Sequence, residues 1–150
     1  MERVRSSDIG AHVGRRVRVL GWLHASRLLG GVSFLIVRDG WGTVQAVTED
    51  AADLAPLREA GAGLETVLAV EGDVVAMPQA PGGVELHNLV IEIITPVRDE
   101  PPVPLSKREI RAALPTLLDH AVVANRHPAR RAAFRLAAAA MAGFRATLAA

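Results

Sequence analysis

The feature that most constrains the fold is a succession of three short segments rich in β-branched and aromatic residues, at 16–28, 32–38 and 43–48. Glycines 30–31 separate the first two segments, and the run Asp39-Gly40-Trp41-Gly42 separates the second from the third. Such a pattern is typical of consecutive β-hairpins. A three-stranded meander cannot bury both of its faces, so we expect later segments to close it.

The later segments add one helix and two more strands. The pattern of apolar residues predicts a helix over 50–60, and strand-like runs follow at 66–76 and 84–94. We therefore predict a mainly β fold with the order β-β-β-α-β-β, preceded by a short helix or turn over 6–13 that Ser6 or Ser7 caps. This order is the connectivity of the five-stranded OB-fold barrel, which binds oligonucleotides or sugars on one face. The helix would plug the open end of the barrel.

The C-terminal third of the chain has a different composition. Four prolines between residues 95 and 104 predict an extended linker. The run 106–109 (SKRE) resembles a capping box that opens a short helix, and the stretch that begins at Leu114 is expected to be loop. Pro128 suits the first turn of a long final helix. The predicted domains are a barrel (1–96), a linker or hinge (97–128) and a C-terminal helix (129–150).

Large apolar residues surround this final helix, which is typical of a helix that packs against more than one neighbour. They are Phe134, Leu136, Met141, Phe144 and Leu148. The pattern predicts a homodimer or a protein partner that contacts the helix.

The composition limits the possible chemistry. The chain has no cysteine, which excludes disulfides, thiolate metal sites and cysteine nucleophiles and fits a reducing compartment. The five histidines lack metal-ligand spacing, so we predict no metal and no cofactor. We see no signal peptide and no apolar run of the roughly 20 residues that span a membrane. We therefore expect a cytoplasmic protein without membrane contact.

The net charge of +1 conceals a strong pattern. Arginines dominate the first 27 residues, residues 39–92 contain ten acids and one base, Arg58, and the chain is basic again after residue 100. Basic clusters attract phosphate backbones, although ordinary solvated faces are an equally simple explanation. The acidic middle argues against a general nucleic-acid binder, which usually presents a basic groove.

Several motifs together resemble a known family. They are Gly21-Trp22-Leu23, Arg27, Gly30-Gly31, Phe34, Arg38-Asp39, Gly42 and Val44-Gln45, then Leu68 to Gly72, Val84-Glu85-Leu86, the prolines up to Leu105, Leu117 to His120, and Arg126-His127-Pro128. In this order and spacing they resemble the N-terminal anticodon-binding domain of aspartyl- and asparaginyl-tRNA synthetases, of the archaeal or non-discriminating type. The resemblance covers essentially the whole chain and implies a role in translation.

The resemblance also implies roles for four residues. Phe34 would stack on an anticodon base, and Gln45 would meet the edge of the middle base, a uridine in this family. Glu85 would accept a hydrogen bond from a cytosine amino group at the third base, and Arg27 would pair with phosphate or stack on a base. Without the resemblance, Phe34 would be expected in the core. Arg38 and Asp39 could form a stabilising pair at the hairpin, and Asp39 is expected to be structural.

The sequence also departs from the family. The catalytic motifs of class II synthetases are absent, and Ala121 and Asn125 alter the hinge, so we expect no catalytic residue and no aminoacylation by this chain alone. Three interpretations remain open. The chain is a module that binds tRNA or another single-stranded RNA or DNA, a fragment or subunit of an aspartate–tRNA(Asp/Asn) ligase, or a degenerate paralogue that makes protein contacts.

Overall fold

The computed structural model describes residues 2–99 and 101–149, so Ala150, the last residue of the predicted final helix, lies outside the described residues. The chain divides into two compact units, Met1–Glu100 and Pro101–Ala150. The first unit contains all five strands, and the second contains the C-terminal helices.

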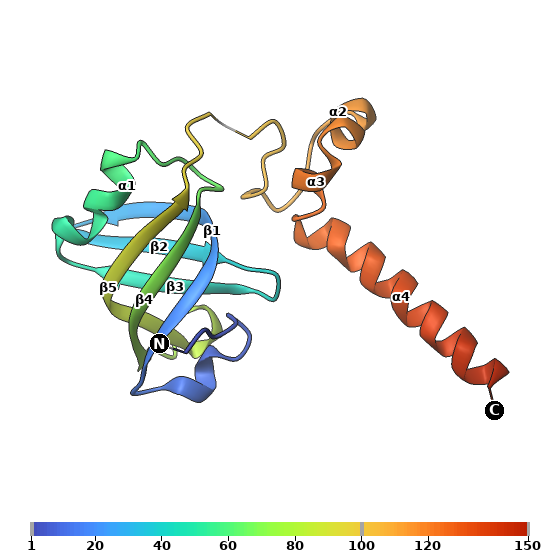
Figure 1. Ribbon diagram of the computed structural model, residues 1–150, viewed down its shortest axis with the longest axis horizontal. Coiled ribbons are helices and arrows are strands. Elements are labelled where there is room, and N and C mark those ends of the chain that lie inside the picture. The colour runs from blue at the N-terminus through green and yellow to red at the C-terminus, as the bar shows by residue number, and fades with distance from the viewer. Residues whose placement is uncertain (1, 100, 150) are drawn as a thin grey trace. The chain divides into compact units, whose positions relative to one another are not determined.

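The first unit is a five-stranded barrel (Figure 1). Its strands are β1 (Arg16–Leu29), β2 (Val32–Arg38), β3 (Thr43–Thr48), β4 (Val67–Ala76) and β5 (Val84–Thr95). They close in the order β1-β2-β3-β5-β4, and β3 and β5 are the parallel pair. The predicted fold class, a mainly β OB-fold barrel followed by a C-terminal helix, is confirmed.

Alternation along each strand separates the inside of the barrel from the outside. In β2, Ser33, Leu35 and Val37 are buried, whereas Phe34 and Ile36 between them are partly exposed. Because the side-chain period of a strand is two, one set of residues fills the core and the other forms the outer face. Leu35, Leu68 and Leu86 belong to one continuous apolar cluster.

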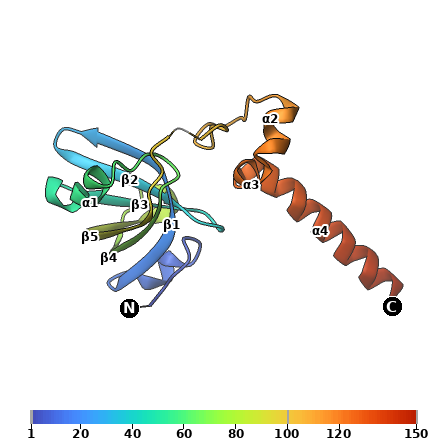
Figure 2. The same cartoon turned by 45° about the horizontal axis from the view of Figure 1, so that its top comes forward.

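Two short helical segments close the ends of this core (Figures 1 and 2). The predicted helix at 50–60 forms as η2 (Ala51–Leu54) and α1 (Ala55–Glu59), and it buries Leu57 in the cluster. At the other end, η1 (Ile9–His12, blue) contributes Ile9. The predicted Ser6 or Ser7 cap of η1 is wrong, because Asp8 precedes the helix and Ser6 donates to Asp39 instead.

Three of the ten acids in the middle of the sequence pair with arginines of β1 on the barrel surface. Arg16 on β1 pairs with Asp73 at 3.3 Å, and Arg18 pairs with Glu71 at 2.7 Å and with Glu92. The strand register explains these pairs, since Arg16 lies opposite Asp73 and Arg18 opposite Glu71. The basic N-terminal block and the acidic middle are therefore complementary surfaces of adjacent strands.

The second unit has its own small core, formed by Val103, Leu105 and Ala124. Its helices are α2 (Leu114–Asp119), α3 (Ala121–Ala124) and α4 (Pro128–Leu148). Among the described residues no helix crosses the bilayer, since none combines the necessary length and apolar character.

The expectations for the linker were partly wrong. The helix predicted at 106–109 does not form, and the stretch predicted as loop from Leu114 is helical. Burial of Leu105 and the bond between the Lys107 carbonyl and His127 Nε2 (2.9 Å) hold that segment in a non-helical path. Pro115 lies in the first turn of α2, where a missing N–H costs nothing.

Helix α4 begins at Pro128, one residue before the predicted start at about Ala129. His127 caps it, because its Nδ1 accepts a hydrogen bond from Ala129 N at 3.2 Å. With Nδ1 as the acceptor, Nε2 carries the proton and donates to the Lys107 carbonyl. One buried histidine thus joins the start of α4 to the linker.

Gly21 is required by a close approach inside the barrel. A Cβ added there would collide with the Arg38 carbonyl oxygen of β2 and lie 2.9 Å from Val37 Cγ1. We predict that Gly21→Ala destabilises the first unit by about 1–3 kcal/mol, because the added methyl group forces β1 and β2 apart. Urea unfolding measures the change. Gly10→Ala is the matched control, since a Cβ at Gly10 meets no atom within 4 Å, and equal losses in both variants would contradict the steric explanation.

Candidate nucleic-acid interface

The structure places all four predicted site residues on the outer face of β1, β2, β3 and β5. Arg27 on β1 lies opposite Phe34 on β2, and Gln45 on β3 lies opposite Glu85 on β5. Paired residues on neighbouring strands project from the same face of a sheet. Phe34 is opposite Val47, two residues along β3 from Gln45. The two pairs are therefore diagonal neighbours.

A β-bulge brings Arg27 to this face. Leu23 pairs with Val37 and Ala25 with Ile36, so His24 is an extra residue on β1. An extra residue reverses which side chains point outward beyond it. Without the bulge, Arg27 would point to the side of Leu35 rather than that of Phe34.

Phe34 is not a core residue. Its neighbours Ser33 and Leu35 point into the barrel and are 5% and 0% exposed, whereas Phe34 is only partly buried. With Ile36 and Val47 it forms an apolar area on the outer face. An outward aromatic ring of this kind can receive a base by stacking.

Glu85 fixes the orientation of the Gln45 amide. Gln45 Nε2 donates to Glu85 Oε1 at 2.6 Å, and Glu85 is only 6% exposed. A carboxylate only accepts hydrogen bonds, so the amide nitrogen must face Glu85. The Gln45 Oε1 atom and the second N–H then remain as an adjacent acceptor and donor, the pair that a uracil edge requires.

His87 completes this cluster, and the sequence did not single it out. Its Nε2 lies 3.1 Å from Glu85 Oε2, so both carboxylate oxygens of Glu85 have a partner. The available signal was the spacing of two residues on one strand, which puts Glu85 and His87 on the same face. That spacing alone is too common to indicate a site.

Arg38 pairs with a different acid from the one considered. Its Nη2 donates to Glu65 Oε1 at 2.5 Å and to Oε2 at 2.7 Å, and both side chains are about 5% exposed. The guanidinium also lies 5.1 Å from the centre of the Trp22 ring. Glu65, just before β4, is therefore an acid partner of Arg38 that the sequence did not indicate.

Asp39 organises the β2–β3 turn, as expected. Its carboxylate accepts hydrogen bonds from Ser6 N and Oγ at 2.8 and 2.6 Å, and from the backbone N–H groups of Trp41 and Gly42 at 2.7 and 2.9 Å. Burial alone raises the pKa of Asp39, but the hydrogen bonds from Ser6, Trp41 and Gly42 outweigh it and lower that pKa below its ordinary value. The charged carboxylate thus ties the N-terminal segment to the turn.

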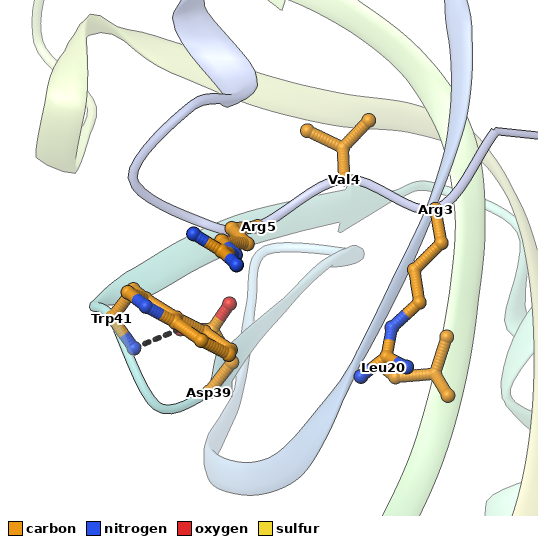
Figure 3. Close-up of a pocket in the computed structure, with 6 residues that line it drawn as sticks. All are labelled: Arg3, Val4, Arg5, Leu20, Asp39 and Trp41. Carbon is orange, nitrogen blue, oxygen red and sulfur yellow. Dashed lines mark hydrogen bonds between the residues drawn. The ribbon is translucent and has the colours of Figure 1, made fainter.

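A cavity of about 280 Å³ lies beside this turn (Figure 3). None of the four predicted site residues lines it. Its walls are Arg3, Val4, Arg5, Leu20, Asp39 and Trp41. Among the described residues, no three histidine, aspartate or glutamate side chains converge to hold a metal ion.

The closed five-stranded barrel has the architecture of an OB-fold, and the comparison with a known family agrees. Residues 17–94 match the tRNA anti-codon family model, described as an OB-fold nucleic acid binding domain. The chain belongs to this family. Its domain is of the anticodon-binding type found in aspartyl- and asparaginyl-tRNA synthetases.

Three relatives illustrate this placement. Aspartate–tRNA(Asp/Asn) ligase of Thermus thermophilus is 39% identical over 143 residues, which are 95% of this chain and 32% of the relative. The asparaginyl-tRNA synthetase structure from Pyrococcus horikoshii has a TM-score of 0.70 at 30% identity and covers 85% of this chain and 30% of its own. Aspartyl-tRNA synthetase from Entamoeba histolytica, at 18% identity, shares the fold with a TM-score of 0.80 over 99% of this chain and 37% of its own. The chain spans about a third of the length of the curated relatives it matches.

The lowered pKa of Asp39 predicts a pH-dependent contribution to stability. The ionised carboxylate stabilises the fold above the ordinary pKa of about 4, and this stabilisation is lost as pH falls through the lower folded-state pKa. We expect Asp39→Asn to lower the free energy of unfolding by about 1–3 kcal/mol at pH 7. Below about pH 4 the free energies of unfolding of the variant and the original protein should differ less. Urea unfolding at both pH values tests this. Glu49→Gln, at an exposed acid, is the control, and a pH-independent difference for Asp39→Asn would contradict the prediction.

Proposed function

We propose that the outer face around Phe34 and Gln45 reads the anticodon of an aspartate- or asparagine-type tRNA. The observation that supports this most directly is the Gln45–Glu85 hydrogen bond of 2.6 Å, which holds a donor and an acceptor beside an outward aromatic ring. Discrimination by base edges depends on such fixed groups and tolerates an acidic neighbour. The names of the relatives, which are ligases for tRNA(Asp/Asn) or asparaginyl-tRNA synthetases, support the choice of tRNA.

Each residue has a distinct part in this proposal. Phe34 stacks on one splayed base, and the free Gln45 groups bond the N3–H and a carbonyl of the middle uridine. Glu85 orients Gln45 and accepts from the amino group of a neighbouring cytosine, since a carboxylate has about four acceptor sites. Exposed Arg27, opposite Phe34, contacts a phosphate or stacks on a base.

The role in aminoacylation follows from the relatives as a proposal only. We propose that this domain supplies tRNA recognition to an aspartate or asparagine ligation reaction, in which the chemistry depends on a class II catalytic domain. The residues argued above bind and orient RNA, and none of them is placed to activate an amino acid.

The direct test is binding to stem–loop RNAs that differ only in the anticodon. We expect the original protein to prefer a GUC loop over a scrambled loop. Phe34→Ala should weaken binding by the roughly 1–3 kcal/mol that one stacked base contributes. Gln45→Ala should remove the preference for the middle uridine. Filter binding at fixed salt measures both effects.

Matched variants separate this result from general surface effects. Val90→Ala removes an exposed apolar residue from β5, and Gln79→Ala removes an exposed glutamine from the turn before it. Both should retain the original affinity and preference. Equal affinity of the original protein for the two loops would show the proposal to be wrong.

A second proposal concerns α4, which we propose contacts another protein surface, such as a second copy of this chain. Phe134, Leu136, Met141, Phe144 and Leu148 are between 52% and 73% exposed. No described residue covers them, and all except Leu136 lie on one face of α4, which is typical of a helix that packs against a neighbour.

The oligomeric state tests this second proposal. We expect the original chain to elute from a sizing column as an assembly at high concentration and Phe134→Glu/Phe144→Glu to shift it toward the monomer, because a buried interface cannot accept two charges. Ala139→Glu/Ala146→Glu also introduces two acids into α4, on the face opposite Phe134 and Phe144, and serves as the control. An original chain that remains monomeric at all concentrations would exclude the homodimer.

A further inference from the structure

The cavity beside the β2–β3 turn has no role in the proposed reading of bases. One wall is the stacked pair Arg5 and Trp41, and the opposite wall is Arg3 beside Leu20 (Figure 3). The backbone of the N-terminal segment is held in place here, because Val4 N donates to the Arg18 carbonyl at 3.0 Å and Val4 is 6% exposed. The two arginines therefore project from an ordered segment.

These arginines differ from the others at the start of the chain. Arg16 and Arg18 pair with acids of β4 and β5. In the part of the chain that the structure describes, neither Arg3 nor Arg5 pairs with a carboxylate. Asp39 is the one acid in the cavity wall among these residues, and its carboxylate already accepts four hydrogen bonds.

The stacking of Arg5 prepares it for an anion. Its Cζ lies 4.4 Å from the centre of the Trp41 ring. A guanidinium stacked on a ring has its flat face covered, but its N–H donors lie in the plane and remain available. A planar fork fixed in this way matches phosphate oxygens and loses little side-chain entropy on binding.

The cavity is lined by an outward residue of β1, the strand that also carries Arg27. Leu20 lines it and points outward from β1, and Arg27 is seven residues further along the same strand. At about 3.3 Å per residue, the separation is at most roughly 23 Å. A few nucleotides of an extended strand bridge this distance, so one RNA can reach both places.

We propose that this cavity binds a backbone phosphate of the RNA whose anticodon meets Phe34 and Gln45, with Arg3 and Arg5 as the ligands and Trp41 as the residue that positions Arg5. The choice of RNA rests on the proposed function. Leu20 and the open edge of Trp41, which is 55% exposed, suit the sugar or base attached to that phosphate. The site contributes affinity but no sequence preference.

The test measures affinity and its salt dependence for the GUC and scrambled stem–loops. We expect Arg3→Gln/Arg5→Gln to weaken the binding of both RNAs by about the same factor, roughly tenfold. The double variant should also reduce the slope of log K against log salt by about 0.7, the value for one phosphate of a single strand. Trp41→Leu should cause a smaller loss with the same lack of sequence dependence. Arg15→Gln/Arg98→Gln removes two exposed charges of the same unit elsewhere and is the control.

The outcomes separate this inference from the proposed function. If Arg3→Gln/Arg5→Gln behaves like the control while the GUC preference persists, the phosphate site is overturned and the anticodon proposal stands. If the original protein shows no GUC preference but the double variant still lowers affinity and slope, the phosphate site stands and anticodon reading fails. Absence of any RNA binding overturns both. Far-ultraviolet circular dichroism, which reports backbone structure, confirms that each variant is folded.

Discussion

The structure depends on the double pairing of β1. Its first half pairs with β4 from Arg16 to Trp22, and its second half pairs with β2 from Trp22 to Leu29. One strand can serve both neighbours only if it bends sharply and if another backbone can approach it. Gly21 permits the approach, since its missing Cβ leaves room for the Arg38 carbonyl, and the bulge at His24 increases the local twist. Gly21 thus allows the barrel to close, and the bulge at His24 turns Arg27 outward.

Charge complementarity between strands has a second consequence for binding. Asp73 and Glu71 of β4 and Glu92 of β5 pair with arginines of β1, so the acidic middle of the sequence presents less free negative charge than its composition indicates. Arg38 and Glu65 form a similar pair under the Trp22 ring. The arginines left without an acid partner among the described residues include Arg3, Arg5 and Arg27. A surface that is nearly neutral overall can therefore still present a few well-placed cations to a phosphate backbone.

The sequence predicted the barrel well because its signals are local. The limits of β2 and β3 coincide with the predicted runs 32–38 and 43–48, and glycines mark the turns. The sequence-based predictions were wrong where tertiary contacts determine the local structure. The SKRE run at 106–109 has the local chemistry of a helix start, but burial of Leu105 and the His127 bond hold it otherwise. Arg27 and Phe34 could be proposed as site residues only through the resemblance. They share a face because of a β-bulge that has no recognisable signal in the sequence. His87 and the Arg5–Trp41 pair require the folded register.

Two kinds of recognition are separated on one barrel. Gln45 is held by Glu85, so its free groups have a fixed direction and can distinguish one base edge from another. Arg5 is held by Trp41, so its donors have a fixed plane, but the phosphate that suits that plane is the same at every nucleotide. A side chain held in one orientation selects among RNA sequences only when the group that it binds differs from one nucleotide to the next. The barrel thus assigns discrimination to the β3–β5 contact and general affinity to the N-terminal segment, and changes in one can leave the other intact.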